Sequence, residues 1–146
     1  MCKDIEYYLP HKAPMLLIDS LVDVDENSCH CQTWVTEDSA VSNFIEGNDL
    51  DCTFYIELMA QCIGVWSGYH QRQADATTIK KGMLVGVRNA NFFENKCPSG
   101  KLLEIYTNSI MVENNVGSFE CKVISDGCLV AEAMITTYQI EDEAVL

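Results

Sequence analysis

The sequence has few basic residues, and this shortage limits what the protein can bind. Nine lysines and arginines stand against 22 aspartates and glutamates, which gives a net charge of −13. Nucleic-acid phosphates require a positive surface, so the composition argues against a nucleic-acid partner. Six of the nine basic residues nonetheless fall between positions 72 and 101, against two acidic ones. This stretch either steers an acidic partner to one place or is ordinary solvated surface.

Long apolar runs are also missing. No stretch of 18 apolar residues occurs, which excludes a helix that crosses a membrane. The first residues lack the apolar centre of a signal peptide, and the sequence therefore predicts a cytoplasmic protein. A length of 146 residues, 48% of them hydrophobic, predicts a single domain, 1–146, around one core.

Metal-binding spacings are absent although the chain contains eight cysteines. No pair has the C-x-x-C spacing, and without an export signal disulfides are not expected. Cys29, His30 and Cys31 lie in an alternating segment, 28–35, where both cysteines share one strand face and His30 points the other way. Further ligands at a suitable spacing are missing, so we expect a plain strand and no metal site here.

A long helix is predicted from about 53 to 73. Only Glu57 and Gln61 are strongly polar between Phe54 and Trp66, and a helix that is apolar nearly all round is a buried helix. Glu57, Gln61 and two glycines, Gly64 and Gly68, fall at i, i+4, i+7 and i+11, so they share one small, polar face.

Strands are predicted on both sides of this helix. The apolar run 15–24 and the alternating segment 28–35 precede it, and a loop over 37–52 includes a short helical turn around 38–45. After the helix, segments 82–93, 101–113, 117–125 and 128–140 read as an antiparallel meander of four strands, with a hairpin turn at Asp126-Gly127. The sequence therefore predicts an α+β fold in which a curved sheet is wrapped around one central helix.

Three motifs resemble one family. The opening Leu9-Pro10-His11-Lys12-Ala13-Pro14, followed by Met15-Leu16-Leu17-Ile18-Asp19, is similar to the start of the 3-hydroxyacyl-[acyl-carrier-protein] dehydratases of the FabZ/FabA type. Ile56-Glu57-Leu58-Met59-Ala60-Gln61 resembles their helix motif, and Cys97-Pro98-Ser99-Gly100 their Pro-Gly turn. The form of the helix motif is closest to the ApeP-like aryl-polyene branch.

The resemblance implies a hot-dog fold, in which two protomers join their sheets and the acyl chain lies in a tunnel at the dimer interface. It implies loss of water from a 3-hydroxyacyl thioester of acyl carrier protein, without metal or organic cofactor. The partner would be a second copy or another hot-dog subunit.

The resemblance also implies that Glu57 is the catalytic carboxylate, which acts as the acid. Gln61 would orient Glu57 or bind substrate, or else be a packing amide at the dimer contact. The histidine that serves as the base in the family is missing. Alignment by spacing places Asn43 at its position, and alignment by motif places Asn48 there. Asn48 and its neighbour Gly47 are candidate substrate-binding residues.

Three other sources of a base stay open. His11 would have to reach the site, although its Pro-His context favours a structural role. Asp49 or Asp51 would have to be desolvated. Alternatively, a partner subunit would supply its own histidine. His70 is expected at the surface.

Lys80, Lys81, Arg88 and Lys96 are expected around the tunnel mouth, as a docking patch for the acidic carrier protein. The missing histidine favours a second hypothesis, a non-catalytic subunit that binds the carrier or stabilises an active paralogue. A third, an acyl thioesterase, fits the helix carboxylate but not the opening motif.

Overall fold

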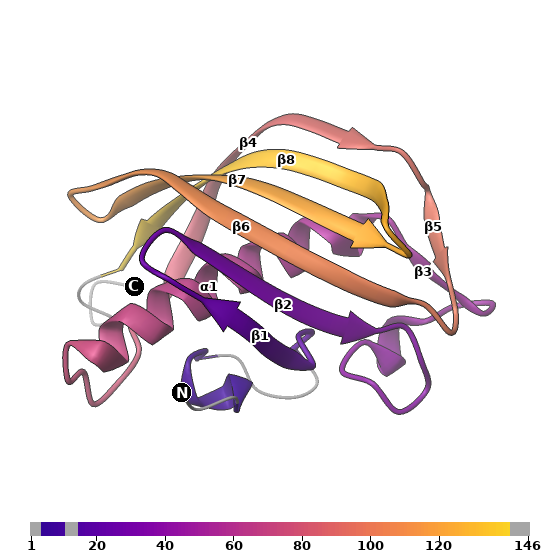
Figure 1. Cartoon of the computed structure of the whole chain (residues 1–146), viewed down its shortest axis with the longest axis horizontal. Helices are drawn as coiled ribbons and strands as arrows, with labels where there is room; N and C mark the ends of the chain where they lie inside the picture. The colour runs from indigo at the N-terminus through magenta and orange to yellow at the C-terminus, as the bar shows by residue number, and fades with distance from the viewer. Residues whose placement is uncertain (1–3, 11–14, 141–146) are drawn as a thin grey trace.

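The computed structural model describes residues 4–10 and 15–140, which form one helix and two sheets in the order shown in Figure 1. The elements, with two 3-10 turns labelled η, are η1 (Ile5–Tyr7), β1 (Ser20–Val24), β2 (Ser28–Trp34), η2 (Ser42–Phe44), β3 (Asp49–Asp51), α1 (Thr53–Gln73), β4 (Gly82–Phe92), β5 (Lys96–Pro98), β6 (Leu102–Glu113), β7 (Val116–Ser125) and β8 (Cys128–Gln139).

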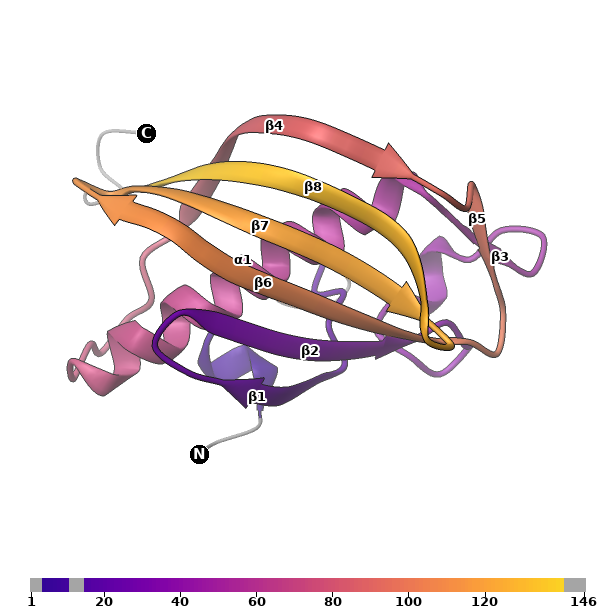
Figure 2. The same ribbon diagram turned by 45° about the horizontal axis from the view of Figure 1, so that its top comes forward.

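Six strands form one curved antiparallel sheet in the order β1-β2-β6-β7-β8-β4, and α1 lies along its concave side (Figures 1 and 2). Inward-facing strand residues alternate with exposed ones, and they pack on the helix in one continuous core. The α+β architecture with one enclosed helix is therefore confirmed.

The helix has the predicted bounds, Thr53–Gln73. Its start is held by Asp51, whose carboxylate accepts hydrogen bonds from the Thr53 backbone N–H at 3.0 Å and the Thr53 hydroxyl at 2.7 Å. These two bonds lower the pKa of Asp51, and they satisfy one of the backbone donors that every helix start leaves free. None of the helices in the described part of the chain is long and apolar enough to cross a membrane.

The predicted meander of four strands is wrong in one respect. β6, β7 and β8 are consecutive neighbours, but β4 pairs with β8 at the far edge and not with β6. The chain leaves β4 through β5, which pairs with β3 in a separate two-stranded sheet, and β2 takes the place beside β6. Pairing between β4 and β8 shifts register twice, at Leu84/Gly86 and at Arg88/Asn91.

The predicted strand over 15–24 is too long, because regular pairing begins only at Ser20. In the preceding segment, the Leu17 backbone bonds to side chains and not to a neighbouring strand. Its N–H donates to Gln61 Oε1 at 2.8 Å, and its carbonyl accepts from the Thr33 hydroxyl at 2.8 Å.

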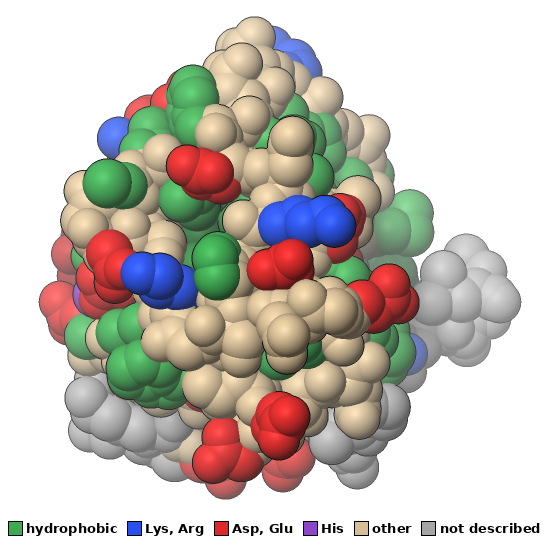
Figure 3. All heavy atoms as spheres, turned by 90° about the vertical axis from the view of Figure 1, so that its right-hand side faces the viewer, with side chains coloured by type: hydrophobic (Ala, Val, Ile, Leu, Met, Phe, Trp, Pro, Cys, Tyr) green, Lys and Arg blue, Asp and Glu red, His purple; other side chains and the backbone are tan. Residues whose placement is uncertain are grey.

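Two turns lie where the sequence predicts them. Asp126 and Gly127 both have positive φ and join β7 to β8, as the Asp-Gly signal predicts. The helical turn expected around 38–45 is a 3-10 turn at Ser42–Phe44. Figure 3 shows the end of the molecule that carries β3 and β5, where hydrophobic side chains lie between scattered acidic and basic ones.

Candidate functional site

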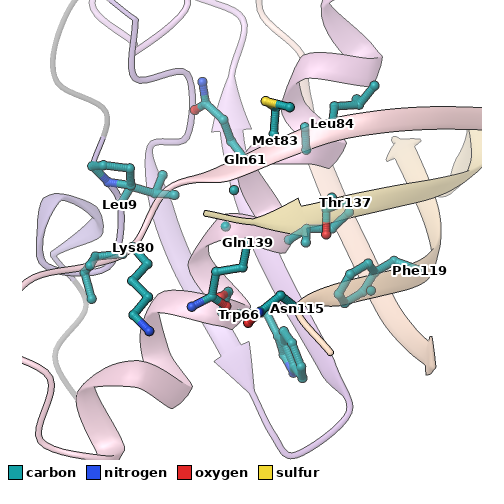
Figure 4. A pocket seen from close by; sticks show the side chains of 18 of the residues that line it. Leu9, Gln61, Trp66, Lys80, Met83, Leu84, Asn115, Phe119, Thr137 and Gln139 are labelled. Atoms are coloured by element: carbon teal, nitrogen blue, oxygen red, sulfur yellow. The ribbon is translucent and has the colours of Figure 1, made fainter. Parts of the chain in front are cut away.

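A pocket of about 280 Å³ lies between one face of α1, the N-terminal segment and the ends of β4, β7 and β8 (Figure 4). In this view Gln61 and Met83 lie on one side, and Lys80, Asn115 and Gln139 lie on the opposite side. The wall is mixed, with polar groups near apolar ones; it includes Leu9, Glu57, Gln61, Trp66, Ser67, Lys80, Met83, Leu84, Asn115, Phe119, Thr137 and Gln139.

Glu57 brings the one carboxylate of α1 to this pocket, and its side chain is half-buried. The Gln61 side-chain amide donates to Glu57 Oε1 at 3.3 Å. The same amide donates to the Met15 carbonyl at 2.8 Å, while its oxygen accepts from Leu17. Gln61 is therefore a buried bridge, which fixes the N-terminal segment on α1 and also contacts the carboxylate.

The two glycines on this helix face serve close packing. A Cβ at Gly68 would overlap the backbone carbonyl of Tyr8, and one at Gly64 would meet the Leu9 side chain at 2.6 Å. The N-terminal segment can thus lie directly on α1, where Leu9 forms part of the pocket wall. The small polar face that the sequence indicates therefore has two overlapping uses: it lines the pocket at Glu57, Gln61 and Gly64, and it lets the N-terminal segment pack closely at Gly64 and Gly68.

The described histidines lie away from Glu57. His30 is on the outer face of the sheet, stacked on Tyr106, with its Nε2 3.1 Å from Glu104 Oε1. His70 contacts the Asp25 carbonyl at 2.9 Å, and it lies thirteen residues after Glu57, or roughly 20 Å along the helix. His11 lies outside the described residues.

The loop that would carry the missing histidine folds into a tight turn. Gly47 and Asn48 both have positive φ, between Glu46 and Asp49, which exchange backbone hydrogen bonds of 2.9 and 3.0 Å. Both turn residues are exposed, as is Asn43, and none of the three lines the pocket.

The carboxylates of this loop are not arranged as bases. Asp51 is exposed and bound to Thr53, and its lowered pKa is the opposite of what desolvation would give. The Asp49 backbone pairs with Glu46 and Pro98, and its side chain does not line the pocket. The hypothesis of a desolvated Asp51 is therefore wrong.

The structure separates the four basic residues, all of which are exposed. Lys80 lines the pocket and Lys81 follows it directly. Arg88 is six residues into β4 from Gly82, or about 20 Å away, and Lys96 lies beyond the end of that strand in β5. At the β5 end, basic side chains lie singly among acidic ones (Figure 3).

Cys29 and Cys31 share the inward face of β2 and His30 points outward, as the alternation predicts. Nothing in the sequence indicated that Cys62 of α1 would meet them. The three sulfurs all lie within 4.8 Å of one another. Only the folded topology brings the helix thiol to the strand pair, so spacing along the chain could not have found it.

A curved antiparallel sheet around one helix, with a helix carboxylate at a pocket, defines a hot-dog protein with a candidate acid–base site. Solved structures share this fold. The acetyl-CoA-bound protein smu.793 from Streptococcus mutans UA159 superposes with a TM-score of 0.66 at 14% identity, over 91% of this chain and 96% of that one. At this identity the similarity shows the fold alone.

Closer relatives are dehydratases. A chain of the dehydratase heterocomplex ApeI:P from Xenorhabdus doucetiae is 34% identical, with a TM-score of 0.90, over 96% of this chain and 92% of that one. The 3-hydroxyacyl-[acyl-carrier-protein] dehydratase FabZ of Brucella abortus (strain S19) is 28% identical over 130 residues, which are 87% of this chain and 80% of the relative. The ApeP-like family model, described as ApeP dehydratase, matches residues 3–146, and the chain belongs to this family.

Proposed function

We propose that the protein is a subunit of a 3-hydroxyacyl-carrier-protein dehydratase that works with a second hot-dog subunit. The observation that carries the proposal is the half-buried Glu57 carboxylate at the pocket wall, contacted by the buried Gln61. In this reaction a base removes the C2 proton of the acyl thioester, and Glu57, as the carboxylic acid, protonates the C3 hydroxyl. Water then leaves and the 2-enoyl thioester forms.

The second subunit supplies the base. His30 and His70 lie away from Glu57, and Asp51 is engaged at the helix start. The relative from Xenorhabdus doucetiae is part of a dehydratase heterocomplex, which supports an assembly of two different chains. The pocket volume of about 280 Å³ is at the lower end for small-molecule sites, ~300–1,000 Å³, so a second chain that extends its walls would suit an acyl substrate.

The edge strand β4 is where the second subunit binds. It is the last strand of its sheet, and it bears exposed apolar side chains on both faces, including Met83, Leu84, Val85 and Val87. An exposed edge of this kind is a ready template for a further strand. Since Met83 and Leu84 also line the pocket, a subunit paired here would lie next to Glu57.

The alternative is a non-catalytic subunit that stabilises an active partner. It is favoured by the loop at Gly47 and Asn48, which forms a hairpin turn and presents no base. The assay that separates the two incubates the chain, alone and with a candidate hot-dog partner, with 3-hydroxyacyl-carrier protein and follows the enoyl product.

Replacement of Glu57 by Gln tests the catalytic role. Removal of the acid should lower the rate of the complex by about 10²–10⁴-fold, while the complex still assembles on size-exclusion chromatography. Glu46→Gln is the matched control, because Glu46 is exposed and does not line the pocket. An unchanged rate with Glu57→Gln would assign the chain the non-catalytic role.

For carrier docking we propose Lys80, which lines the pocket, and Lys81, the exposed residue that follows it. The double variant Lys80→Gln/Lys81→Gln should weaken carrier-protein binding at least tenfold at low salt and less at high salt, because exposed charge pairs are screened. Arg88→Gln/Lys96→Gln removes the same charge from β4 and β5, at positions that do not line the pocket. An equal loss with both double variants, measured by surface plasmon resonance, would point to general charge attraction and not to a docking site.

A further inference from the structure

The core contains a cluster of three thiols from two elements, which the proposed dehydration does not use. Cys29 and Cys31 project inward from β2, and Cys62 faces them from α1. The Cys29 and Cys31 sulfurs are 3.8 Å apart, and all three side chains are at most 2% exposed. The Cys62 thiol donates to the carbonyls of Cys29 and Ile105 at 3.7 Å each.

Three convergent sulfurs are a ligand set for a thiophilic ion, because thiolates prefer soft ions. Within the described residues, no fourth His, Cys, Asp or Glu joins the group. Structural zinc sites take four protein ligands in a tetrahedron, so this cluster lacks one ligand for zinc. The geometry therefore favours an ion that binds three sulfur ligands and needs no fourth.

The net charge of the complex narrows the choice of ion further. The three sulfurs are enclosed in the apolar core of the protein. A net charge enclosed in an apolar core is costly. Three thiolates around a monovalent ion would leave two negative charges, and around a divalent ion one, whereas a trivalent ion gives a neutral complex.

We propose that Cys29, Cys31 and Cys62 form a three-thiol site for trivalent arsenic, taken up as uncharged arsenous acid. Each thiol proton passes to one arsenic-bound hydroxyl, which leaves as water. Three S–H and three As–O bonds break, and three As–S and three O–H bonds form. Nothing is oxidised or reduced, and no net proton is released, so the exchange is neutral from start to finish.

The site would link two elements. Cys62 directly follows Gln61, and β2 is an inner strand of the sheet, between β1 and β6. Entry requires a local opening between α1 and β2, after which the bound ion joins helix to sheet. We therefore expect binding to be slow and to raise the thermal stability, because the ligand binds the folded arrangement of the three thiols.

The test uses the full reduced chain with sodium arsenite and intact mass spectrometry under non-denaturing conditions. The expected adduct has the mass of one arsenic atom less three hydrogen atoms. An adduct that retains a hydroxyl would show two-sulfur binding and would overturn the proposal. Cys29→Ala, Cys31→Ala and Cys62→Val should each abolish the three-sulfur adduct, with circular dichroism melts to verify that each variant folds.

Two control variants keep the cluster intact. Cys121 is buried but its sulfur bonds to the Thr107 hydroxyl at 3.4 Å, and Cys128 is exposed. Cys121→Ala and Cys128→Ser should bind arsenic as the parent chain does, with the same rise in Tm. If the adduct disappears in either control, or survives in any cluster variant, the three sulfurs are only a packed part of the core.

Discussion

At the residue scale, Gln61 is the polar side chain that organises the candidate site. It is 1% exposed, yet each polar atom of its amide has a partner: Oε1 accepts from Leu17, and Nε2 donates to Met15 and to Glu57. A buried amide with all these bonds fixes both segments that it joins. The two roles considered for Gln61, packing and orientation of Glu57, are thus compatible in one side chain.

Gln61→Leu should destabilise the fold by about 1–3 kcal/mol, because the Leu17 N–H and the Met15 carbonyl would lose buried partners. Urea unfolding followed by circular dichroism measures the change. Gln73→Leu makes the same chemical change at the exposed end of the same helix, and should stay within about 0.5 kcal/mol of the parent. Equal effects of the two substitutions would contradict a bridging role for Gln61.

Some residues of the candidate site could be predicted from the sequence, because a physical pattern marks them. Glu57 is a single acid in an otherwise apolar helix, so it could be predicted without a structure. The partners of Gln61 could not, since Met15 and Leu17 are backbone groups more than 40 positions away in a segment with no regular pairing. The same is true of Cys62, whose neighbours in β2 are distant in sequence.

At the scale of elements, α1 depends on how closely the N-terminal segment approaches it. Gly68 lies where a methyl group would overlap the Tyr8 backbone, while at Gly64 the obstacle is the end of the Leu9 side chain. A backbone cannot move aside without displacing η1, whereas a leucine side chain can change rotamer. The two glycines are therefore not equivalent.

Gly68→Ala should destabilise the protein by about 1–3 kcal/mol through overpacking. Gly64→Ala should be close to neutral, because alanine gains up to about 1 kcal/mol of helix propensity and offsets the shift of Leu9. Differential scanning calorimetry of both variants gives the comparison. A larger loss for Gly64→Ala would mean that η1 does not rest on α1 as described.

Elements with strong local patterns were predicted well, and those that depend on distant pairing were not. The bounds of α1 follow from its apolar run, and the β7–β8 turn follows from Asp126-Gly127. The place of β4 at the edge is decided by competition with β2 for the side of β6, which no local pattern encodes. β3 and β5 have three residues each, too few to show an alternation.

At the scale of the molecule, the exposed apolar edge of β4 lies next to the candidate site. Val85 is 53% exposed there, beside Met83 and Leu84 at the pocket. Apolar side chains on both faces of an edge strand are a liability in an isolated protein. In the proposed assembly, the edge and the pocket belong to one interface.

Val85→Asp should weaken assembly with the partner subunit by at least tenfold in Kd, or about 1.4 kcal/mol, because the interface would bury an unpaired charge. Trp34→Asp, at an equally exposed apolar position on β2, is the control and should assemble normally. Analytical ultracentrifugation of mixtures measures both. Normal assembly of Val85→Asp would place the interface elsewhere.

The two register shifts along β4 bear on what this edge can accept. Each shift marks an irregularity that bends the strand, so a straight segment of a foreign chain fits this edge less well than a neighbour with matching bends. Bulges of this kind are among the features by which edge strands resist the repeated addition of strands that builds fibres. We therefore expect the irregular edge of β4 to favour one shape-matched partner strand and to disfavour the open-ended stacking of identical strands.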